Sequence, residues 1–314
     1  MKNIICVISG PTASGKTSTS IKLAKRYNGV VVNFDSLVFY KEISIGTAKP
    51  TLEEQGGIEH FLVGTQSICD PLNAADFLKI AEPLIQSLHR DNKIVFLVGG
   101  SGFYLQALLN GMYDSITTPK DVIERSNTLY NEEGIKPFLE ILAQNDPESL
   151  NKYHENDHYR VRRAVEHFWT TGAKFSEARN EMDDRKKNSP TVKNKWNVFH
   201  AYLDLPKDEH FQIIQNRTKE MIDKGLLDEV DTLLNLGFSG HEKPLQSIGY
   251  KECFDYKKGV FDSLDAFIER INISTRQLAK SQRTWFKKVE KHEYHPLKDQ
   301  EKLISDFDNY LNKL

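Results

Sequence analysis

The feature that most constrains the fold is a glycine-rich loop at residues 10–17, with the sequence Gly-Pro-Thr-Ala-Ser-Gly-Lys-Thr. It follows an apolar run at 3–9 and precedes a helix-like stretch at 18–27, which predicts the order strand, loop, helix. The glycines let backbone N–H groups turn toward a phosphate chain, Lys16 adds a positive charge, and the dipole of the following helix favours an anion. The Thr17 hydroxyl is suited to Mg²⁺.

This loop predicts a phosphate site. The alternative is an ordinary tight turn with a surface lysine, because the same pattern also arises by chance. Its place between a strand and a helix favours the phosphate site, although it does not identify the reaction. The predicted phosphate-binding residues are Gly10, Pro11, Thr12, Ala13, Ser14, Gly15, Lys16 and Thr17.

Length and composition favour a globular chain with two bodies. With 314 residues, 39% of them hydrophobic and 27% charged, the chain can bury one large core or two smaller ones. The formal net charge of -2 gives no overall attraction to nucleic acid, so any such binding must come from local patches.

Cysteine usage and hydropathy bear on the compartment. Cys6, Cys69 and Cys253 are far apart and odd in number, which argues against a disulfide framework and against a zinc site. The apolar N-terminus is too short for a signal segment, and no later stretch is long and apolar enough to span a bilayer. We therefore expect a cytoplasmic protein without membrane attachment, and we expect it to be a monomer.

Two further runs predict buried parallel strands. The β-branched run at 29–34 and the run at 93–98 are continuous and apolar, and a helix-like stretch at 74–90 lies between them. Pro83 should kink or divide that helix. The alternation of strands and helices predicts a doubly wound α/β sheet, in which ligands bind at the carboxyl ends of the strands.

Polar residues follow the predicted strands at this edge. Asp35 ends the run at 29–34, and Ser101 follows two glycines after the run at 93–98. We therefore expect both side chains to meet the phosphate loop in one crevice. Asp35 either assists a metal, accepts a proton from an incoming nucleophile, or only closes the strand in an Asx turn. Ser101 either contacts the ligand or only caps the helix that begins near Gly102.

Blocks along most of the chain resemble, in the same order, those of the bacterial tRNA dimethylallyltransferases. They span the chain from Cys6 to about Lys288. The Gly-Thr-Ala-Lys-Pro block at 46–50 and the Arg-Gln-Leu-Ala-Lys block at 276–280 are far more specific than the phosphate loop. The matching blocks are residues 10–17, 35–36, 40 with 45–50, 74–77, 98–104, 160–164, 217–230, 247–250 and 275–280.

The resemblance implies a P-loop NTPase-like fold and a specific reaction. A dimethylallyl group passes from dimethylallyl diphosphate to the N6 amine of the adenosine 3' to the anticodon in tRNA, and diphosphate is released. The phosphate loop then holds the donor with Mg²⁺, although the family's loop is often assigned ATP as well, and a P-loop recognises either by its phosphate oxygens.

Residue roles follow from the same resemblance. Asp35 corresponds to the general base at the adenine amine, Ser101 to a hydroxyl lining the reaction channel, and Arg217 to a cation on the diphosphate side. With Lys16 these are the catalytic candidates. The family more often has threonine where Ser101 stands, so the hydroxyl is kept. The resemblance assigns to tRNA the residues Asp35, Ser36, Leu37, Val38, Ser101, Arg125, Tyr159, Arg160, Val161, Arg162 and Arg163.

A helical insertion is expected from about Ile116 to residue 189, so that residues 1–115 and 190–314 form the α/β core. Strand-like runs vanish there, and residues 196–205 read as a strand that returns to the sheet. Between His158 and Lys195 there are about ten basic against five acidic residues, which favours an RNA-backbone surface over a solvated face with internal ion pairs. The insertion's predicted helices are 120–130, 135–144, 157–171 and 174–181, separated by breakers such as Gly134, Asp146-Pro147 and Gly172.

A second basic stretch lies near the C-terminus. At about 100° per residue, one helix face carries the basic side chains and the opposite face carries apolar ones. This pattern favours phosphate contacts, by RNA or diphosphate, over a solvated helix. The predicted basic face comprises Arg276, Lys280, Arg283 and Lys287, and the predicted packed face comprises Leu278, Trp285 and Val289. Further helices are expected at 207–224, 227–236 and 298–314.

Three alternative functions share the phosphate loop. A kinase should carry a carboxylate after the run at 93–98 and an arginine-rich lid, and neither is evident. A prenyltransferase for free adenine nucleotides has no need of a basic insertion. A GTP-type switch lacks its Asn-Lys-x-Asp signature here.

Overall fold

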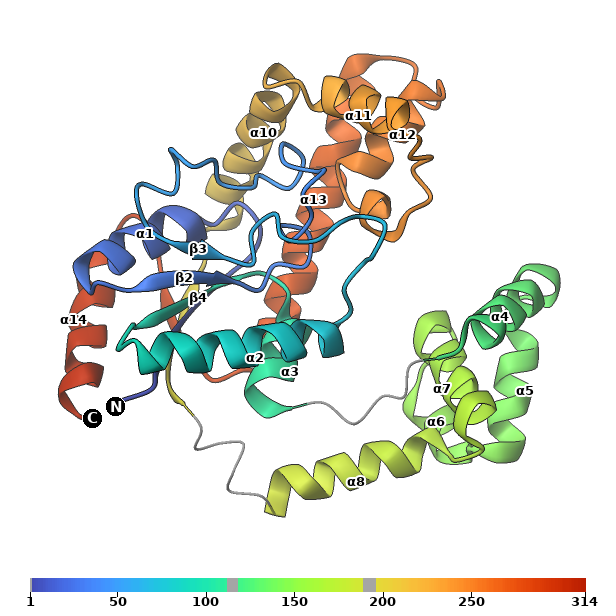
Figure 1. Ribbon diagram of the computed structural model, residues 1–314. Coiled ribbons are helices and arrows are strands. Elements are labelled where there is room, and N and C mark those ends of the chain that lie inside the picture. Colours follow the sequence, from blue (N-terminus) through green and yellow to red (C-terminus); the bar gives the residue numbers. More distant parts are fainter. Residues whose placement is uncertain (1, 112–117, 189–195) are drawn as a thin grey trace. The chain divides into compact units, whose positions relative to one another are not determined.

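The computed structural model describes residues 2–111, 118–188 and 196–314 (Figure 1). These residues form two compact units, one of Met1–Leu108 with Lys195–Leu314 and one of Leu109–Asn194. The expected start of the insertion at Ile116 and its expected end at Ser189 and Pro190 lie outside the described residues.

The first unit is built on a six-stranded sheet with the order β3-β2-β4-β1-β5-β6, in which every neighbouring pair is parallel. The predicted runs are confirmed as β2, β4 and β5, and the predicted doubly wound, P-loop NTPase-like sheet is confirmed with them. β3 and β6 are too short for a hydrophobic pattern to show. The strands are β1 (Ile4–Ser9), β2 (Val30–Asn33), β3 (His60–Phe61), β4 (Val95–Gly99), β5 (Asn197–Leu203) and β6 (His292–Tyr294).

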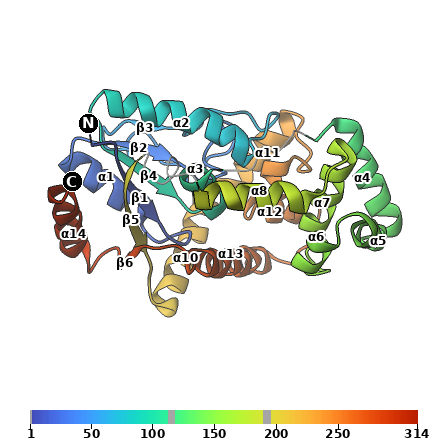
Figure 2. The ribbon, with the colours of Figure 1, turned by 90° about the horizontal axis from the view of Figure 1, so that it is seen from below.

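Helices cover both faces of this sheet (Figures 1 and 2). α1 (Lys16–Arg26) and α14 (Gln300–Asn312) pack on one face, where their apolar side chains meet alternate strand residues such as Cys6, Phe96 and Phe199. α2 (Ala74–Arg90) contacts β4, and the C-terminal end of α13 (Leu264–Phe286) meets β5, where Phe286 packs against Tyr202. Because α1 starts directly after β1, the loop between them lies at the carboxyl edge of the sheet.

Of the two effects expected of Pro83, a kink or a division of the helix, the division is wrong. The helix runs unbroken from Ala74 to Arg90, and Asn73 caps its first turn by accepting from the N–H of Ala75 and Asp76. Pro83 lies on the exposed side of the helix. Water can reach the carbonyl that loses its partner there, so the apolar face of the helix continues without a break.

The C-terminal helices of the first unit pack around a second core. Its fully buried members include Leu226, Tyr250 and Phe267. Gly225, with φ 91°, ends the first helix of the predicted pair and begins the second. These helices are α10 (Lys207–Asp223), α11 (Leu226–Asn235), a 3-10 turn (Lys243–Gln246), α12 (Tyr250–Lys257) and α13. α13 also packs on α3 (Gly102–Asn110), where Trp285 lies against Gly102.

The second unit is helical, around a small apolar core of Phe138, Leu142 and Val165. One helix there was not expected. Asp146 and Pro147, interpreted as a break, begin α6, because the buried Asp146 carboxylate accepts from Ser149 and Ser176 and Pro147 suits a first helical turn. The helices are α4 (Lys120–Glu133), α5 (Lys136–Asn145), α6 (Pro147–Lys152), α7 (His158–Thr171) and α8 (Phe175–Asn188).

Within the described residues, no helix combines the length and the hydropathy that crossing a bilayer demands.

Candidate active site

The phosphate loop between β1 and α1 has the backbone of an anion cradle. Gly10, Ala13 and Gly15 have positive φ angles of 154°, 62° and 78°. Such angles bend the loop so that successive N–H groups turn toward one side. A Cβ on Gly10 would lie 2.3 Å from the Leu203 carbonyl oxygen, so only glycine fits where the loop passes β5.

Lys16 folds back over this loop. Its Nζ donates to the carbonyl oxygens of Gly10, at 3.1 Å, and Pro11, at 2.8 Å. Burial lowers the pKa of Lys16 to about 8; the negative charge of Asp35 opposes this shift and the positive charge of Arg217 reinforces it. An anion in the loop would stabilise the ammonium form, so Lys16 can bind a phosphate group as a cation.

Ser14 supplies a second sign of an anion site. Its hydroxyl is buried and has no hydrogen-bond partner among the residues that the structure describes. A buried hydroxyl without a partner costs free energy, and a phosphate oxygen in the loop would remove that cost.

Arg217 reaches the loop from α10. Its Nη1 donates to the Thr12 hydroxyl at 3.1 Å. Burial lowers the pKa of this guanidinium, and the carboxylate of Asp35 opposes the shift. The structure thus brings Lys16, Arg217 and Asp35 into one electrostatic cluster from three distant segments.

Asp35 follows β2 directly. Its backbone N–H donates to Asn33 Oδ1 at 2.9 Å, and its own Oδ1 accepts from the N–H of Leu37 at 3.2 Å. The Asx turn considered from the sequence is therefore present. It engages only one carboxylate oxygen; the other has no hydrogen-bond partner in the described parts of the chain and stays available for a ligand.

The Ser101 side chain does not cap α3, and its contact with a ligand stays a prediction. Its hydroxyl accepts from the Ser36 N–H at 3.0 Å and donates to the Ser36 hydroxyl at 3.1 Å. Its carbonyl, rather than its side chain, begins α3 by accepting from Leu105 N–H at 3.2 Å. Ser101 thus links the segment after Asp35 to the start of α3 and keeps both beside the phosphate loop.

Sequence reasoning missed the residues that hold the Gly-Thr-Ala-Lys-Pro block. The Glu229 carboxylate accepts from the N–H groups of Ser44, at 2.9 Å, and Ile45, at 3.0 Å, and from the Tyr250 hydroxyl. Tyr250 in turn accepts from Gly46 N–H at 3.1 Å. Both residues lie in blocks that carried the family resemblance, so the only available signal was their membership in those blocks.

The two faces predicted for the second basic stretch are wrong in part, since Trp285 packs against Phe286 as expected but other residues of both faces differ from the prediction. Arg276 pairs with Glu269 at 2.6 Å and Arg283 with Asp204 at 2.7 Å, so these charges are compensated inside the protein. Leu278, assigned to the packed face, is exposed. The assignment failed because Asp204 lies 79 residues away in the sequence, beyond any local count of charge.

The length of this helix was also overestimated. α13 ends at Phe286, so Lys287 and Val289 lie beyond it. Lys280 is exposed and has no ion pair within the described ranges. It is the residue of this stretch that best retains the predicted role of an RNA contact.

In the second unit, several predicted tRNA residues also support the fold. Arg162 donates to Ser126 and lies over the Tyr130 ring, 4.6 Å from its centroid, and Arg163 pairs with the buried Glu166 at 2.9 Å. Such contacts fix these guanidinium groups whether or not RNA binds.

Other charged and aromatic side chains of this unit remain open to a partner. Arg125 is exposed and covers Trp169, 4.0 Å from the ring centroid. Arg160, paired with Asp157, keeps 65% of its side chain exposed, and Tyr159 is 73% exposed. Their contact with tRNA remains a prediction.

Comparison with known proteins places these features in one family. Residues 38–289 match the family model described as IPP transferase. The chain is 35% identical over 281 residues to tRNA dimethylallyltransferase 2 of Geotalea daltonii, covering 90% of this chain and 84% of the relative. It is 34% identical over 289 residues to tRNA dimethylallyltransferase of Halalkalibacterium halodurans, covering 91% and 89%.

Two crystal structures share the architecture. The tRNA isopentenylpyrophosphate transferase of Bacillus halodurans superposes with a TM-score of 0.72 at 30% identity, over 99% of this chain and 98% of that one. A eukaryotic dimethylallyltransferase solved acting on tRNA superposes with a TM-score of 0.79 at 28% identity, over 100% of this chain and 77% of that one.

Proposed function

The chain belongs to the IPP transferase family, that of the tRNA dimethylallyltransferases, and from this premise we propose the reaction and the role of each residue in it. It transfers a dimethylallyl group to tRNA. The donor is dimethylallyl diphosphate, and the acceptor is the N6 amine of the adenosine 3' to the anticodon. The observation that carries this assignment is the phosphate loop with Lys16 folded over it and Arg217 bound to its Thr12 hydroxyl, both cations interacting electrostatically with the Asp35 carboxylate.

The donor diphosphate lies in the phosphate loop. The loop N–H groups and the Ser14 hydroxyl bind its oxygens, and Lys16 moves from the carbonyls of Gly10 and Pro11 to the phosphate. When the bond to the allylic carbon breaks, negative charge grows on the leaving oxygens. Lys16 and Arg217 lie where that charge develops, so they stabilise the transition state more than the bound donor.

The acceptor amine meets Asp35. An adenine amine is a poor nucleophile, and a placed carboxylate helps by accepting its hydrogen bond and then its proton. The Asx turn fixes one oxygen of Asp35 against Leu37 N–H, which leaves the other to face the amine. Ser101, through Ser36, sets the position of this turn relative to the start of α3.

The residues present fit a magnesium ion that takes most of its ligands from phosphate and water. Thr17 is exposed in the first turn of α1 and offers one hydroxyl, while the described residues contain no group of three or more His, Cys, Asp or Glu side chains that could hold a metal on their own. Mg²⁺ usually keeps several waters and binds through substrate phosphates. When bound there, it neutralises charge on the diphosphate.

Donor binding should weaken as the pH rises through about 8. In the free protein the pKa of Lys16 is lowered to about 8, so its positive charge is present at pH 7 and mostly lost at pH 9. A phosphate monoester loses its last proton at a pKa of about 6, so the donor's charge changes little over this range. We expect about tenfold lower affinity for dimethylallyl diphosphate at pH 9 than at pH 7, measured by calorimetry without tRNA.

The Lys16→Met variant is the control for this pH dependence. It has no titrating ammonium group in the loop, so its weaker affinity should stay flat between pH 7 and pH 9. A slope in the variant equal to that of the unaltered protein would assign the titration to another group.

Lys280 should contribute to tRNA binding through charge alone. A phosphate contact releases about one counterion, so Lys280→Met should reduce the slope of log affinity against log salt by about 1 for an anticodon stem-loop. The matched control is Lys313→Met near the C-terminus, which removes the same charge. Equal salt slopes for Lys280→Met and the unaltered protein would remove Lys280 from the interface.

One assay separates the proposed reaction from its rivals. The purified protein is given labelled dimethylallyl diphosphate and Mg²⁺ with either an unmodified anticodon stem-loop or AMP, and ATP hydrolysis is measured in parallel. Label transfer to the stem-loop alone supports the proposal. Transfer to AMP alone, or ATP hydrolysis without transfer, contradicts it.

A further inference from the structure

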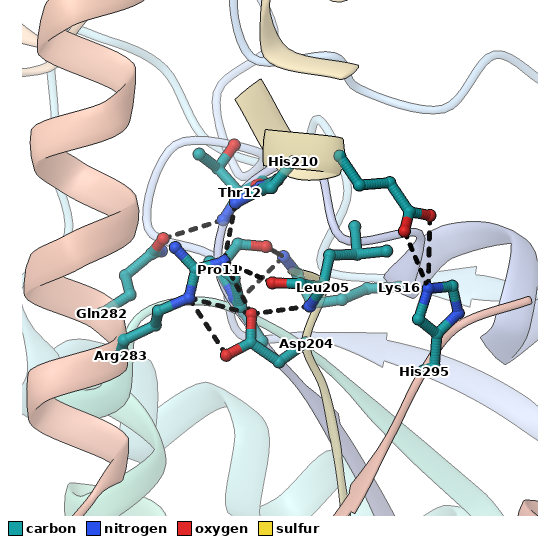
Figure 3. Close-up of polar contacts among 11 residues, drawn as sticks. Pro11, Thr12, Lys16, Asp204, Leu205, His210, Gln282, Arg283 and His295 are labelled. Atoms are coloured by element: carbon teal, nitrogen blue, oxygen red, sulfur yellow. Dashed lines mark hydrogen bonds and ion pairs between the residues drawn. The ribbon is translucent and has the colours of Figure 1, made fainter. Parts of the chain in front are cut away.

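Thr12, in the middle of the phosphate loop, is held by side chains from α10 and α13. Its backbone N–H donates to Gln282 Oε1 at 2.8 Å, and its carbonyl oxygen lies 2.8 Å from His210 Nε2 (Figure 3). Arg217 donates to its hydroxyl. All three polar groups of Thr12 are therefore engaged by distant parts of the chain, 270 residues away in the case of Gln282.

His210 has a defined protonation state and tautomer in this arrangement. Its Nδ1 lies 2.8 Å from Arg283 Nη2, and a guanidinium can only donate. Nδ1 is therefore the acceptor, and Nε2 carries the proton that it donates to the Thr12 carbonyl. The imidazole is fully buried, and burial lowers its pKa. The positive charge of Arg283 also lowers this pKa. His210 is thus neutral.

Arg283 is in turn fixed by Asp204, which follows β5. Its Nε lies 2.9 Å and its Nη2 2.7 Å from Asp204 Oδ1, and Nη2 also donates to the Leu205 carbonyl at 3.3 Å. Only 19% of the Arg283 side chain is exposed. Asp204, His210, Gln282 and Arg283 together form what we call the Thr12 brace.

The contacts of the Thr12 brace have a consequence for anion binding. A cradle made of backbone N–H groups works only if the carbonyl oxygens, which repel phosphate, point elsewhere. His210 holds the Thr12 carbonyl away, whereas Lys16 holds those of Gly10 and Pro11 and can release them. Gln282 takes the Thr12 N–H, and the Ser14 N–H donates to the Pro11 carbonyl at 3.3 Å, so phosphate must be bound by other N–H groups of the loop.

The Thr12 brace also joins the phosphate loop to the segment that follows β4. Gln282 Nε2 donates to the Gly100 carbonyl at 3.1 Å, directly before Ser101. A Cβ on Gly100 would lie 2.4 Å from that nitrogen, so a glycine is needed for this approach. The Gln282 side chain therefore sets the distance between the phosphate loop and the segment that carries the Ser101 hydroxyl.

We propose that His210 and Arg283 are positioning residues for the donor diphosphate, acting through the Thr12 carbonyl, and that Arg283 does not contact tRNA. This inference rests on the proposed function for the identity of the donor. It reassigns a cation that the sequence pattern placed on the RNA side, because the Nε and Nη2 donors of Arg283 are engaged by Asp204, Leu205 and His210 and only 19% of its side chain is exposed.

The test compares donor and tRNA binding in matched variants. His210→Leu keeps the side-chain volume near that of histidine and removes both hydrogen bonds. We expect its affinity for inorganic pyrophosphate, and for dimethylallyl diphosphate, to fall about tenfold, as for one lost buried hydrogen bond, with stem-loop affinity unchanged. His210→Gln can again offer an N–H to Thr12 and should recover part of the loss.

A second variant keeps the test decisive if His210→Leu does not fold. Arg283→Lys retains the charge but loses the planar fork that bridges Asp204 and His210, so pyrophosphate affinity should fall several-fold while the salt slope of stem-loop binding stays unchanged. The exposed Lys288, in the turn after α13, gives the control Lys288→Ala, for which pyrophosphate affinity should not change.

Two results would overturn the proposal. Either variant binding pyrophosphate as tightly as the unaltered protein would do so, as would Arg283→Lys losing stem-loop affinity in place of pyrophosphate affinity. Failure of the proposed function is a separate observation. It would appear as an unaltered protein that binds pyrophosphate but modifies no tRNA, and pyrophosphate binding would still test the Thr12 brace.

Discussion

Asp35→Ala should reduce the rate of dimethylallyl transfer by about 10²–10⁴-fold, the range for a placed general base. The physical reason is that the adenine amine must lose a proton as it attacks, and Asp35 is the carboxylate that interacts electrostatically with both Lys16 and Arg217. Single-turnover transfer to an anticodon stem-loop, with donor and enzyme in excess, measures this step directly.

The structure predicts that the Asp35→Ala variant still folds. Asp35 is only partly buried, and its side chain contributes one hydrogen bond, to Leu37 N–H. Asp35→Asn is the matched control, because it keeps an oxygen for that turn but cannot take the proton; it should fold equally well and be nearly as slow. Turnover near that of the unaltered protein in Asp35→Asn would exclude proton transfer to Asp35.

Lys16→Met should lower kcat/KM for the donor by about 10²–10³-fold, as expected when one preorganised charge at the leaving group is removed. The loss should appear in kcat as well as in KM, because negative charge grows on the diphosphate only as the bond breaks. Steady-state kinetics with donor varied at saturating stem-loop tests this split.

The same substitution should not lower the Tm. The pKa of Lys16 is depressed to about 8 in the folded protein, so at pH 7 the folded state carries a charge that burial penalises, and a methionine removes that penalty. Lys16→Arg is the control that keeps a charge with another shape, and it should recover donor affinity only in part. A loss in KM alone would mean that Lys16 binds donor and transition state equally.

Most of the sheet could be predicted because its longer strands are mostly apolar and β-branched or aromatic. The runs that became β2, β4 and β5 are continuous, as buried parallel strands must be, and the loop before α1 marked the carboxyl edge. β3, with two residues, carries no such pattern. α6 was missed because Asp146 and Pro147 serve equally well to end one helix and to begin the next.

The residues of the candidate active site were predicted better than the residues that hold them in position. Lys16, Asp35 and Ser101 follow strands, so topology alone brings them together. The residues behind them depend on contacts that no local pattern encodes: His210 reaches Thr12 across 198 residues. For the same reason a local count of charges assigned Arg283 to an exposed basic face. Its partner, Asp204, follows a strand 79 residues away in the sequence.

The central claim is that the cradle for diphosphate and the carboxylate after β2 act together on an adenine amine. It is tested most directly by mass spectrometry of an unmodified anticodon stem-loop after incubation with the protein, dimethylallyl diphosphate and Mg²⁺. The account predicts one added dimethylallyl group, on the adenosine 3' to the anticodon. An unchanged stem-loop, together with transfer of phosphate from ATP to a small molecule, would contradict it.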